Sequence, residues 1–234
     1  MTAGRLVLWR HGRTAYNASA RLQGQVDIPL DDVGRWQARV AATTLLAAHT
    51  PTHVVSSDLG RAADTARILA QAAGLVVTFD ARLKERAFGE WEGLTGAEIH
   101  ERWPDDYAVW TAGGEPQRVG AESRADVAAR TGEAIEEHAA ALDRSDLLVV
   151  VSHGAAIGSA VAELLGMPAN WRWITGMHNA HWAELVPSAA GTEPRWRLAG
   201  YNLGPVGASS DWNAGPDHPT EQDRDADEET RDPR

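Results

Sequence analysis

The stretch LVLWRHG at residues 6–12 is an apolar run that ends in a histidine and a glycine, and LLVVVSHG at residues 147–154 repeats this pattern. Short apolar runs of this kind are typical of strands that are buried on both faces of a sheet. In an open α/β sheet, ligands bind beyond the carboxyl ends of the strands. We therefore expect His11 and His153 to form an imidazole pair around a small anion.

Strand and helix patterns alternate along most of the chain. This alternation predicts an α/β fold, a three-layer sandwich with a mostly parallel central sheet and helices on both faces. The last two strands are expected to run antiparallel at an edge. From Asp105 to Gly120 the periodicity is lost, which predicts a lid or part of a pocket wall. Strands are expected at 6–9, 54–56, 75–79, 147–151, 181–186 and 195–199, and helices from 31 or 32 onward and at 59–73, 94–103, 122–142 and 155–165.

The composition changes near the C-terminal end of the chain. Residues 205–234 contain nine Asp or Glu, three Arg and few apolar side chains. Such a segment does not bury enough surface to offset its loss of conformational entropy. Of the 234 residues, we expect 1–204 to form one domain and 205–234 to form an acidic, disordered tail.

Charge and residue types exclude several classes of function. The formal net charge is −11, which argues against nucleic acid as a partner. The chain has no cysteine, so disulfides, thiolate metal sites and cysteine nucleophiles are excluded. No apolar run approaches the roughly 20 residues that span a bilayer, and no apolar leader precedes the first strand. We expect a cytoplasmic protein without a membrane partner, and the exposed edge strand or the segment 170–174 could support a homodimer.

The first His-Gly motif carries residue types suited to phosphoryl chemistry. A neutral imidazole such as His11 can attack phosphorus, and the planar guanidinium of Arg10 can hold two phosphoryl oxygens. The loop that follows offers neutral donors at Asn17, Gln23 and Gly24.

Two further segments add charge and a proton donor. At residues 56–66, SSDLGRAADTA, a strand ends and a helix begins, which places Arg61 in the first helical turn, where the helix dipole also favours an anion. A carboxyl group such as Glu85 can protonate a leaving alkoxide and later deprotonate water. Alternatively, Glu85 pairs with Arg82 or Arg86, as surface carboxylates usually do.

These elements, in this order, resemble the histidine phosphatase superfamily, in its cofactor-dependent phosphoglycerate mutase-like branch, over about residues 5–200. The signature motifs stand at 10–17 (RHGRTAYN), 56–66 and 152–154 (SHG). The resemblance implies a phosphoglycerate mutase-like fold, transient phosphorylation of His11 and proton donation by Glu85. It also implies that three cationic groups, Arg10, Arg61 and His153, surround the phosphoryl group, assisted by Asn17 and the backbone of Gly24, Gly154 and Ala155.

The implied reaction is hydrolysis of a small-molecule phosphate ester, with neither metal nor cofactor. A mutase that uses bisphosphoglycerate is the first alternative, but Trp103–Arg118 is acidic and lacks the Trp-Arg-Arg run of that group. A catalytically silent phospholigand-binding module is the second. The segments 89–95, 176–182 and 195–198 are similar to actinobacterial glucosyl-3-phosphoglycerate phosphatases, which favours a phosphosugar or glucosyl-3-phosphoglycerate as substrate. His178 and His181 depart from that pattern, and zinc binding by this pair is disfavoured because no third ligand is evident.

Overall fold

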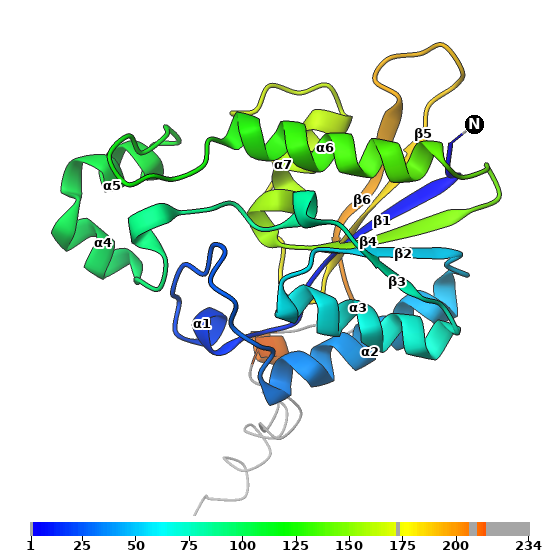
Figure 1. Ribbon diagram of the computed structural model, residues 1–234, viewed down its shortest axis with the longest axis horizontal. Coiled ribbons are helices and arrows are strands. Elements are labelled where there is room, and N and C mark those ends of the chain that lie inside the picture. Colours follow the sequence, from blue (N-terminus) through cyan, green and yellow to red (C-terminus); the bar gives the residue numbers. More distant parts are fainter. Residues whose placement is uncertain (1, 172–173, 206–209, 214–234) are drawn as a thin grey trace, which may run out of the picture.

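The computed structural model describes residues 2–171, 174–205 and 210–213. Its centre is a six-stranded sheet in the order β3-β2-β4-β1-β5-β6 (Figure 1). The first four strands of this order are parallel, and β5 and β6 continue the sheet in antiparallel fashion. The predicted fold class and the antiparallel edge pair are confirmed. The strands are β1 (Arg5–Arg10), β2 (His53–Ser56), β3 (Val77–Phe79), β4 (Leu147–Ser152), β5 (Trp182–Pro187) and β6 (Trp196–Leu203).

Helices cover both faces of the sheet (Figure 1). Successive side chains of a strand point to opposite faces, so Leu6 and Leu8 pack with α6 (Arg124–Ala140) and α7 (Gly154–Leu164). Val7 and Trp9 pack on the other face with α2 (Asp32–Ala48) and α3 (Gly60–Ala73). All four side chains are fully buried. Each buried apolar side chain of this size contributes roughly 1.5–3 kcal/mol, so β1 is held firmly at the centre of both cores.

Two helices lie beside the sheet, and one of them was not expected. Regular structure was predicted to end at Pro104, but α5 (Pro104–Thr111) follows α4 (Gly96–Arg102) directly. Pro104 stands in the first turn of α5, where its missing N–H costs nothing, and two aspartates complement the helix dipole. The sequence pattern does not reveal this helix, because its apolar residues are spread around the helix axis and do not form one apolar face. It packs against buried Trp91 and Ile99 in a small third core.

Short helical turns complete the fold around the carboxyl ends of the strands. They are α1 (Ala15–Ala18), η1 (Ala81–Leu83), η2 (Gly89–Trp91) and η3 (Ser210–Asn213). No helix in the described part of the chain is long and apolar enough to cross a membrane.

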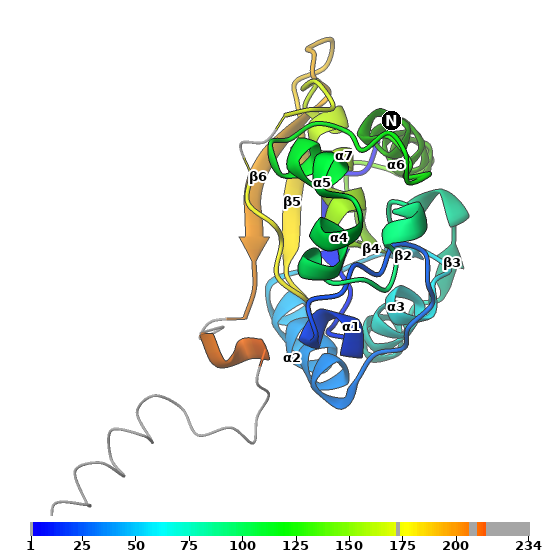
Figure 2. The same cartoon turned by 90° about the vertical axis from the view of Figure 1, so that its left-hand side faces the viewer.

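The start of the predicted tail differs from a solvated chain. Pro205 is buried, and Trp212 in η3 is only 7% exposed. Figure 2 shows η3 beyond the end of β6 and beside α2. A single large aromatic side chain gives this otherwise polar segment enough apolar surface to dock. The tail boundary after residue 204 is therefore wrong for Trp212, while residues 206–209 and 214–234 lie outside the described residues.

Candidate active site

Three neighbouring parallel strands deliver the predicted residues to one edge of the sheet. His11 directly follows β1, His153 follows β4, and Arg61 lies in the first turn of the helix after β2. The structure brings the rings of His11 and His153 to a centroid distance of 5.1 Å, in an edge-on arrangement at 60°. A small ligand beyond the strand ends would therefore meet both imidazoles.

His11 is held as a neutral imidazole. Its Nδ1 lies 2.7 Å from the carbonyl oxygen of Gly12, so Nδ1–H donates and Nε2 carries the lone pair. Burial, followed by the charges of Arg61 and Arg10, lowers the pKa of His11 well below its usual 6.5. The free lone pair on Nε2 is the feature that a nucleophilic histidine needs.

A glycine is required at position 12 because the backbone of α2 lies close to it. A Cβ atom at this position would lie 2.3 Å from the carbonyl oxygen of Gly34 on α2. Any larger residue would push the His11 loop away from α2.

The surroundings of His153 favour a neutral imidazole as well, in contrast to the cationic group that the resemblance implies. Its Nε2 lies 2.9 Å from Oγ of Ser57, which also accepts the N–H of Leu59 at 3.3 Å. We assign the ring proton to Nδ1, which is buried without a partner in the described structure, so that Nε2 accepts the hydroxyl proton of Ser57. Burial, followed by the charges of Arg61, His11 and Arg10, lowers the pKa of His153 well below 6.5. The site combines two guanidiniums with one neutral donor.

Both guanidiniums are anchored by backbone carbonyls. Arg61 donates to Gly24 O at 2.7 Å and to Val26 O at 2.8 Å, and Arg10 donates to Met177 O. The buried Nε–H groups of both arginines and Nδ1 of His153 have no partner among the described residues. Buried polar groups are normally hydrogen-bonded. Three unpartnered nitrogens on three site residues indicate a site for a ligand with several acceptor oxygens.

Glu85 caps the N-terminus of α7. Its carboxylate accepts the N–H of Ala156 at 2.9 Å, of Ala155 at 3.2 Å and of Arg86 at 2.9 Å. His153, the residue before α7, offers no side-chain cap, so Glu85 satisfies amides that would otherwise be orphaned. The Ala155 amide, implied by the resemblance to assist the phosphoryl group, is bonded to Glu85 here.

The alternative pairing of Glu85 with Arg82 or Arg86 is wrong. Arg82 pairs with Asp80 at 2.7 Å, and Arg86 pairs with Glu115. Both arginines are therefore bound elsewhere, and Glu85 faces the site. It interacts electrostatically with Arg10 and Arg61 there.

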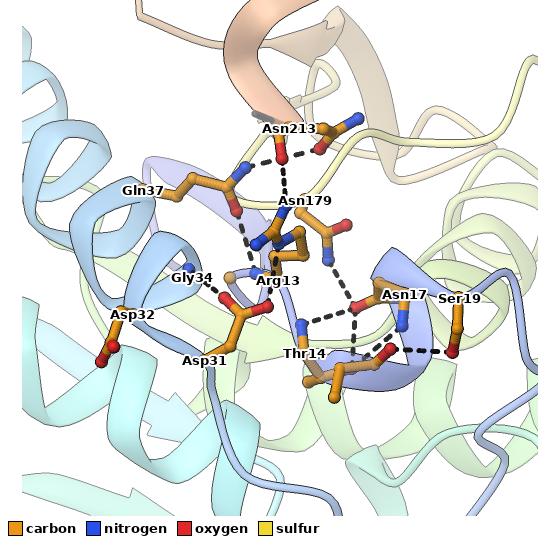
Figure 3. A network of polar contacts seen from close by, with 12 residues as sticks. Arg13, Thr14, Asn17, Ser19, Asp31, Asp32, Gly34, Gln37, Asn179 and Asn213 are labelled. Carbon is orange, nitrogen blue, oxygen red and sulfur yellow. Dashed lines mark hydrogen bonds and ion pairs between the residues drawn. The ribbon is translucent and has the colours of Figure 1, made fainter. Parts of the chain in front are cut away.

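The neutral donors line the loop after His11. Thr14 donates its backbone N–H to Asn17 Oδ1 at 3.2 Å and its hydroxyl to Gln23 Oε1 at 2.9 Å. Asn179 adds a second bond to Asn17 Oδ1, at 3.1 Å (Figure 3). These bonds fix the amide oxygen of Asn17 and leave its NH₂ group for a ligand. Gly24 adopts a φ of +52°, and its carbonyl oxygen binds Arg61.

Some residues that shape the site were missed from the sequence. Asn179 donates to His11 O at 3.2 Å, and Arg130 of α6 donates to the carbonyl oxygens of Lys84 and Glu85 at 2.7 and 3.1 Å. These partners lie 45 or more residues apart. A local pattern contains no signal for them.

His178 and His181 make ring contacts and a hydrogen bond within the fold. The two rings lie 5.3 Å apart. Within the described residues, no third His, Cys, Asp or Glu joins them in a metal-binding group. Buried His181 contacts the ring of Trp212 and bonds the carbonyl oxygen of Asn179 at 3.1 Å.

A cavity of about 320 Å³ adjoins the N-terminus of α7. Arg86 and Arg124 bring guanidiniums to its wall, and Trp171 and Tyr201 bring aromatic rings. The stretch 105–120, predicted to form a lid or part of a pocket wall, does not itself line this cavity, but its Glu115 pairs with both arginines.

Comparison with known proteins places this geometry in a family. The model of the histidine phosphatase superfamily, branch 1, matches residues 6–202. The glucosyl-3-phosphoglycerate phosphatase of Mycobacterium tuberculosis is 42% identical over 214 residues, which cover 86% of this chain and 96% of that protein.

Solved structures agree with the family match. A mycobacterial glucosyl-3-phosphoglycerate phosphatase in complex with VO3 superposes with a TM-score of 0.76 at 43% identity, covering 85% of this chain and 98% of that one. Phosphoserine phosphatase of Entamoeba histolytica in complex with 3-phosphoglyceric acid gives a TM-score of 0.73 at 26% identity, covering 85% and 96%. With its paired imidazoles and anchored guanidiniums, and with this likeness over most of its length, the chain belongs to the histidine phosphatase superfamily, branch 1.

Proposed function

We propose that this protein hydrolyses a phosphate monoester of a small anionic metabolite, with glucosyl-3-phosphoglycerate as the first candidate substrate, through a phosphohistidine at His11. The observation that carries the proposal is the buried, neutral His11, whose Nε2 lone pair is free because Nδ1 is tied to Gly12. The likeness to glucosyl-3-phosphoglycerate phosphatases supports the choice of substrate.

In the first half-reaction, Nε2 of His11 attacks phosphorus and the P–O ester bond breaks. The leaving oxygen takes a proton from Glu85, so the product departs as a neutral alcohol. In the second half-reaction, a water molecule attacks phosphorus and gives its proton to Glu85. The N–P bond breaks, phosphate is released, and His11 returns to its neutral form.

The charge of the transferring phosphoryl group is met by fixed donors. Arg10 and Arg61 supply positive charge, and the Nδ1–H of His153 and the amide of Asn17 supply neutral hydrogen bonds. All four are oriented by bonds to protein groups. Preorganised donors need no rearrangement during the reaction, and loss of one such group typically costs ~10²–10³ in rate.

The proton donor indicates the side on which the organic half of the substrate binds. Because Glu85 protonates the leaving oxygen, that half must lie next to Glu85 and away from His11. The cavity of about 320 Å³ meets this requirement, since it is lined by Arg86 and by Ala155, whose N–H binds Glu85.

The chemistry of this cavity suits an anionic sugar derivative. Arg86 and Arg124, which both pair with Glu115, bring cationic side chains to this cavity, and a guanidinium is the group that binds a carboxylate most specifically. Trp171 and Tyr201 add flat apolar surfaces of the kind on which a sugar ring can pack.

Phosphate release tests the proposal directly. Glucosyl-3-phosphoglycerate, 3-phosphoglycerate, phosphoserine and an aryl phosphate would be compared, with and without chelator, for the wild type, His11→Ala and the exposed-histidine control His53→Ala. We expect turnover in chelator, no effect of His53→Ala, and a loss of about 10³-fold or more in His11→Ala. Turnover that survives in His11→Ala would overturn the proposal. Phosphate transfer between hydroxyls that requires bisphosphoglycerate would indicate a mutase, and binding without turnover would indicate a phospholigand-binding module.

A further inference from the structure

The chain continues past the family-matched residues and returns to the active-site loop. The family match ends at residue 202, whereas Trp212 in η3 is buried against α2 and the 178–181 turn. Its ring lies 5.0 Å from that of Trp36 and 5.7 Å from that of His181. Trp212 is therefore packed against the domain although it lies beyond the residues that the family model matches.

One hydrogen bond leads from Trp212 toward the nucleophile. Its Nε1–H donates to the carbonyl oxygen of Asn179 at 2.9 Å. The side chain of Asn179 donates in turn to His11 O at 3.2 Å and to Asn17 Oδ1 at 3.1 Å. Trp212 is thus linked to both His11 and Asn17 by hydrogen bonds through a single residue, Asn179.

A second tie reaches the loop from the other side. Gln37, fully buried on α2, donates to the carbonyl oxygen of Trp212 at 2.8 Å and accepts the N–H of Arg13 at 2.9 Å. Arg13 also donates to the carbonyl oxygen of Asn213 (Figure 3). The segment 210–213 is therefore bonded to the residues that follow His11 as well as to the turn that faces it.

The turn held by Trp212 has a strained backbone. Ala180 adopts a φ of +57°, in the left-handed region that favours glycine, and its N–H donates to His11 O at 3.1 Å. Such a conformation persists only where surrounding contacts fix it. The bond from Trp212 to Asn179 is one of those contacts.

We propose that residues 210–213 act as a strap and that Trp212 is a positioning residue for catalysis. Acting through Asn179, Trp212 holds the strained turn against His11 O and the amide of Asn17 toward the phosphoryl site. This role rests on the proposed function. It also assigns a catalytic requirement to a segment that lies outside the family-matched residues.

The first test compares matched substitutions in the full chain. Trp212→Phe keeps an aromatic ring but removes the Nε1–H, and Trp196→Phe makes the same change at a buried tryptophan whose Nε1–H binds Glu136 at 2.9 Å. We expect kcat to fall about fivefold in Trp212→Phe with KM little changed, as one lost hydrogen bond would give. In Trp196→Phe, kcat should stay at the wild-type value. Equal kcat values in the two variants would overturn the proposal that residues 210–213 act as a strap.

A double-mutant cycle identifies the route. If Trp212 acts through the side chain of Asn179, Trp212→Phe should lower kcat less in the Asn179→Ala background than in the wild type, because Asn179→Ala already removes the side-chain bonds to His11 O and Asn17. Two reductions that multiply in full would contradict this route. The readout is kcat at a temperature where all variants are folded.

Hydrogen exchange separates the strap from the proposed function. The amide of Ala180 should exchange faster in Trp212→Phe than in either the wild type or Trp196→Phe. If the wild type releases no phosphate, the proposed function fails, while exchange at Ala180 still shows whether Trp212 holds the turn. Unchanged exchange there would overturn the strap even in an active enzyme.

Discussion

The hydroxyl of Ser57 lies 2.9 Å from Nε2 of His153. Oγ of Ser57 also accepts an N–H from Leu59, and we assign its own proton to the bond with the imidazole. Nδ1 of His153 then becomes the donor, and it is a buried atom without a partner in the described structure. In the proposed mechanism, Ser57 thereby orients His153 to donate to a phosphoryl oxygen.

Replacing Ser57 should impair catalysis without unfolding the protein. In Ser57→Ala the proton of His153 is free to move to Nε2, so we expect kcat/KM to fall about tenfold, and Ser57→Thr should recover part of the loss. The matched control is Ser56→Ala, because buried Ser56 bonds only the carbonyl oxygen of Ser57, at 2.9 Å. Equal kcat/KM in Ser57→Ala and Ser56→Ala would contradict the assignment of the ring proton.

The loss of kcat/KM on replacing Glu85 should depend on how strongly the leaving group needs a proton. In Glu85→Gln we expect a loss of about 10²–10⁴ in kcat/KM for an alkyl phosphate ester. An aryl phosphate, whose phenolate leaves without help, should lose less than about tenfold. The exposed neighbour Glu90→Gln serves as control. Equal losses for both substrates would show that Glu85 is not the acid.

The lowered pKa of His11 predicts how its ring titrates. A histidine whose folded pKa lies below its unfolded value stays neutral as the pH falls through 6.5 and takes up a proton only well below it. NMR titration of the imidazoles should therefore show no change in His11 between pH 8 and about pH 6. By linkage, His11 reduces stability below pH 6.5, where the unfolded chain binds the proton more readily. A midpoint near 6.5 in the folded protein would be the contrary result.

Asp80 should stabilise the fold in a pH-dependent way. Its hydrogen bonds to Arg82, together with one to His138, lower the pKa of Asp80 to about 2. The stabilisation is present above the unfolded value near 3.8 and is lost as the pH falls toward 2. Because Arg82 is 34% exposed and water weakens the pair, we expect Asp80→Asn to cost about 1–2 kcal/mol at pH 7.

Urea unfolding at several pH values measures this effect. The difference between wild type and Asp80→Asn should shrink from pH 4 downward. Asp32→Asn, whose carboxylate is fully exposed, should change stability by less than about 0.5 kcal/mol. A difference for Asp80→Asn that stays constant down to pH 2.5 would contradict the lowered pKa.

The sequence predicted those parts of the fold that rest on local patterns. The buried runs at 6–9 and 147–151 became adjacent parallel strands because apolar residues on both faces of a strand require a central position. Helix α5 was missed because its apolar residues do not gather on one side. Docking of Trp212 was missed because composition averages over a segment and hides a single large anchor.

The candidate active site likewise contains residues that the sequence predicts and contacts that it does not. His11, Arg61 and His153 were predicted because each follows a strand in a recognisable motif. The tautomer of His153 and the ties through Asn179 depend on partners 96 and 168 residues away in the chain. Such contacts are set by tertiary packing, and so is the burial that lowers the pKa of His153.

Chemical trapping of the intermediate tests whether His11 is phosphorylated during turnover. Wild type and His11→Ala would be mixed with phosphate-labelled glucosyl-3-phosphoglycerate, quenched in alkali within one turnover, and digested for peptide mass analysis. We expect an acid-labile phosphoryl group on the peptide that contains His11, and none in His11→Ala. A phosphoryl group on another residue, or undiminished turnover in His11→Ala without any label, would contradict it.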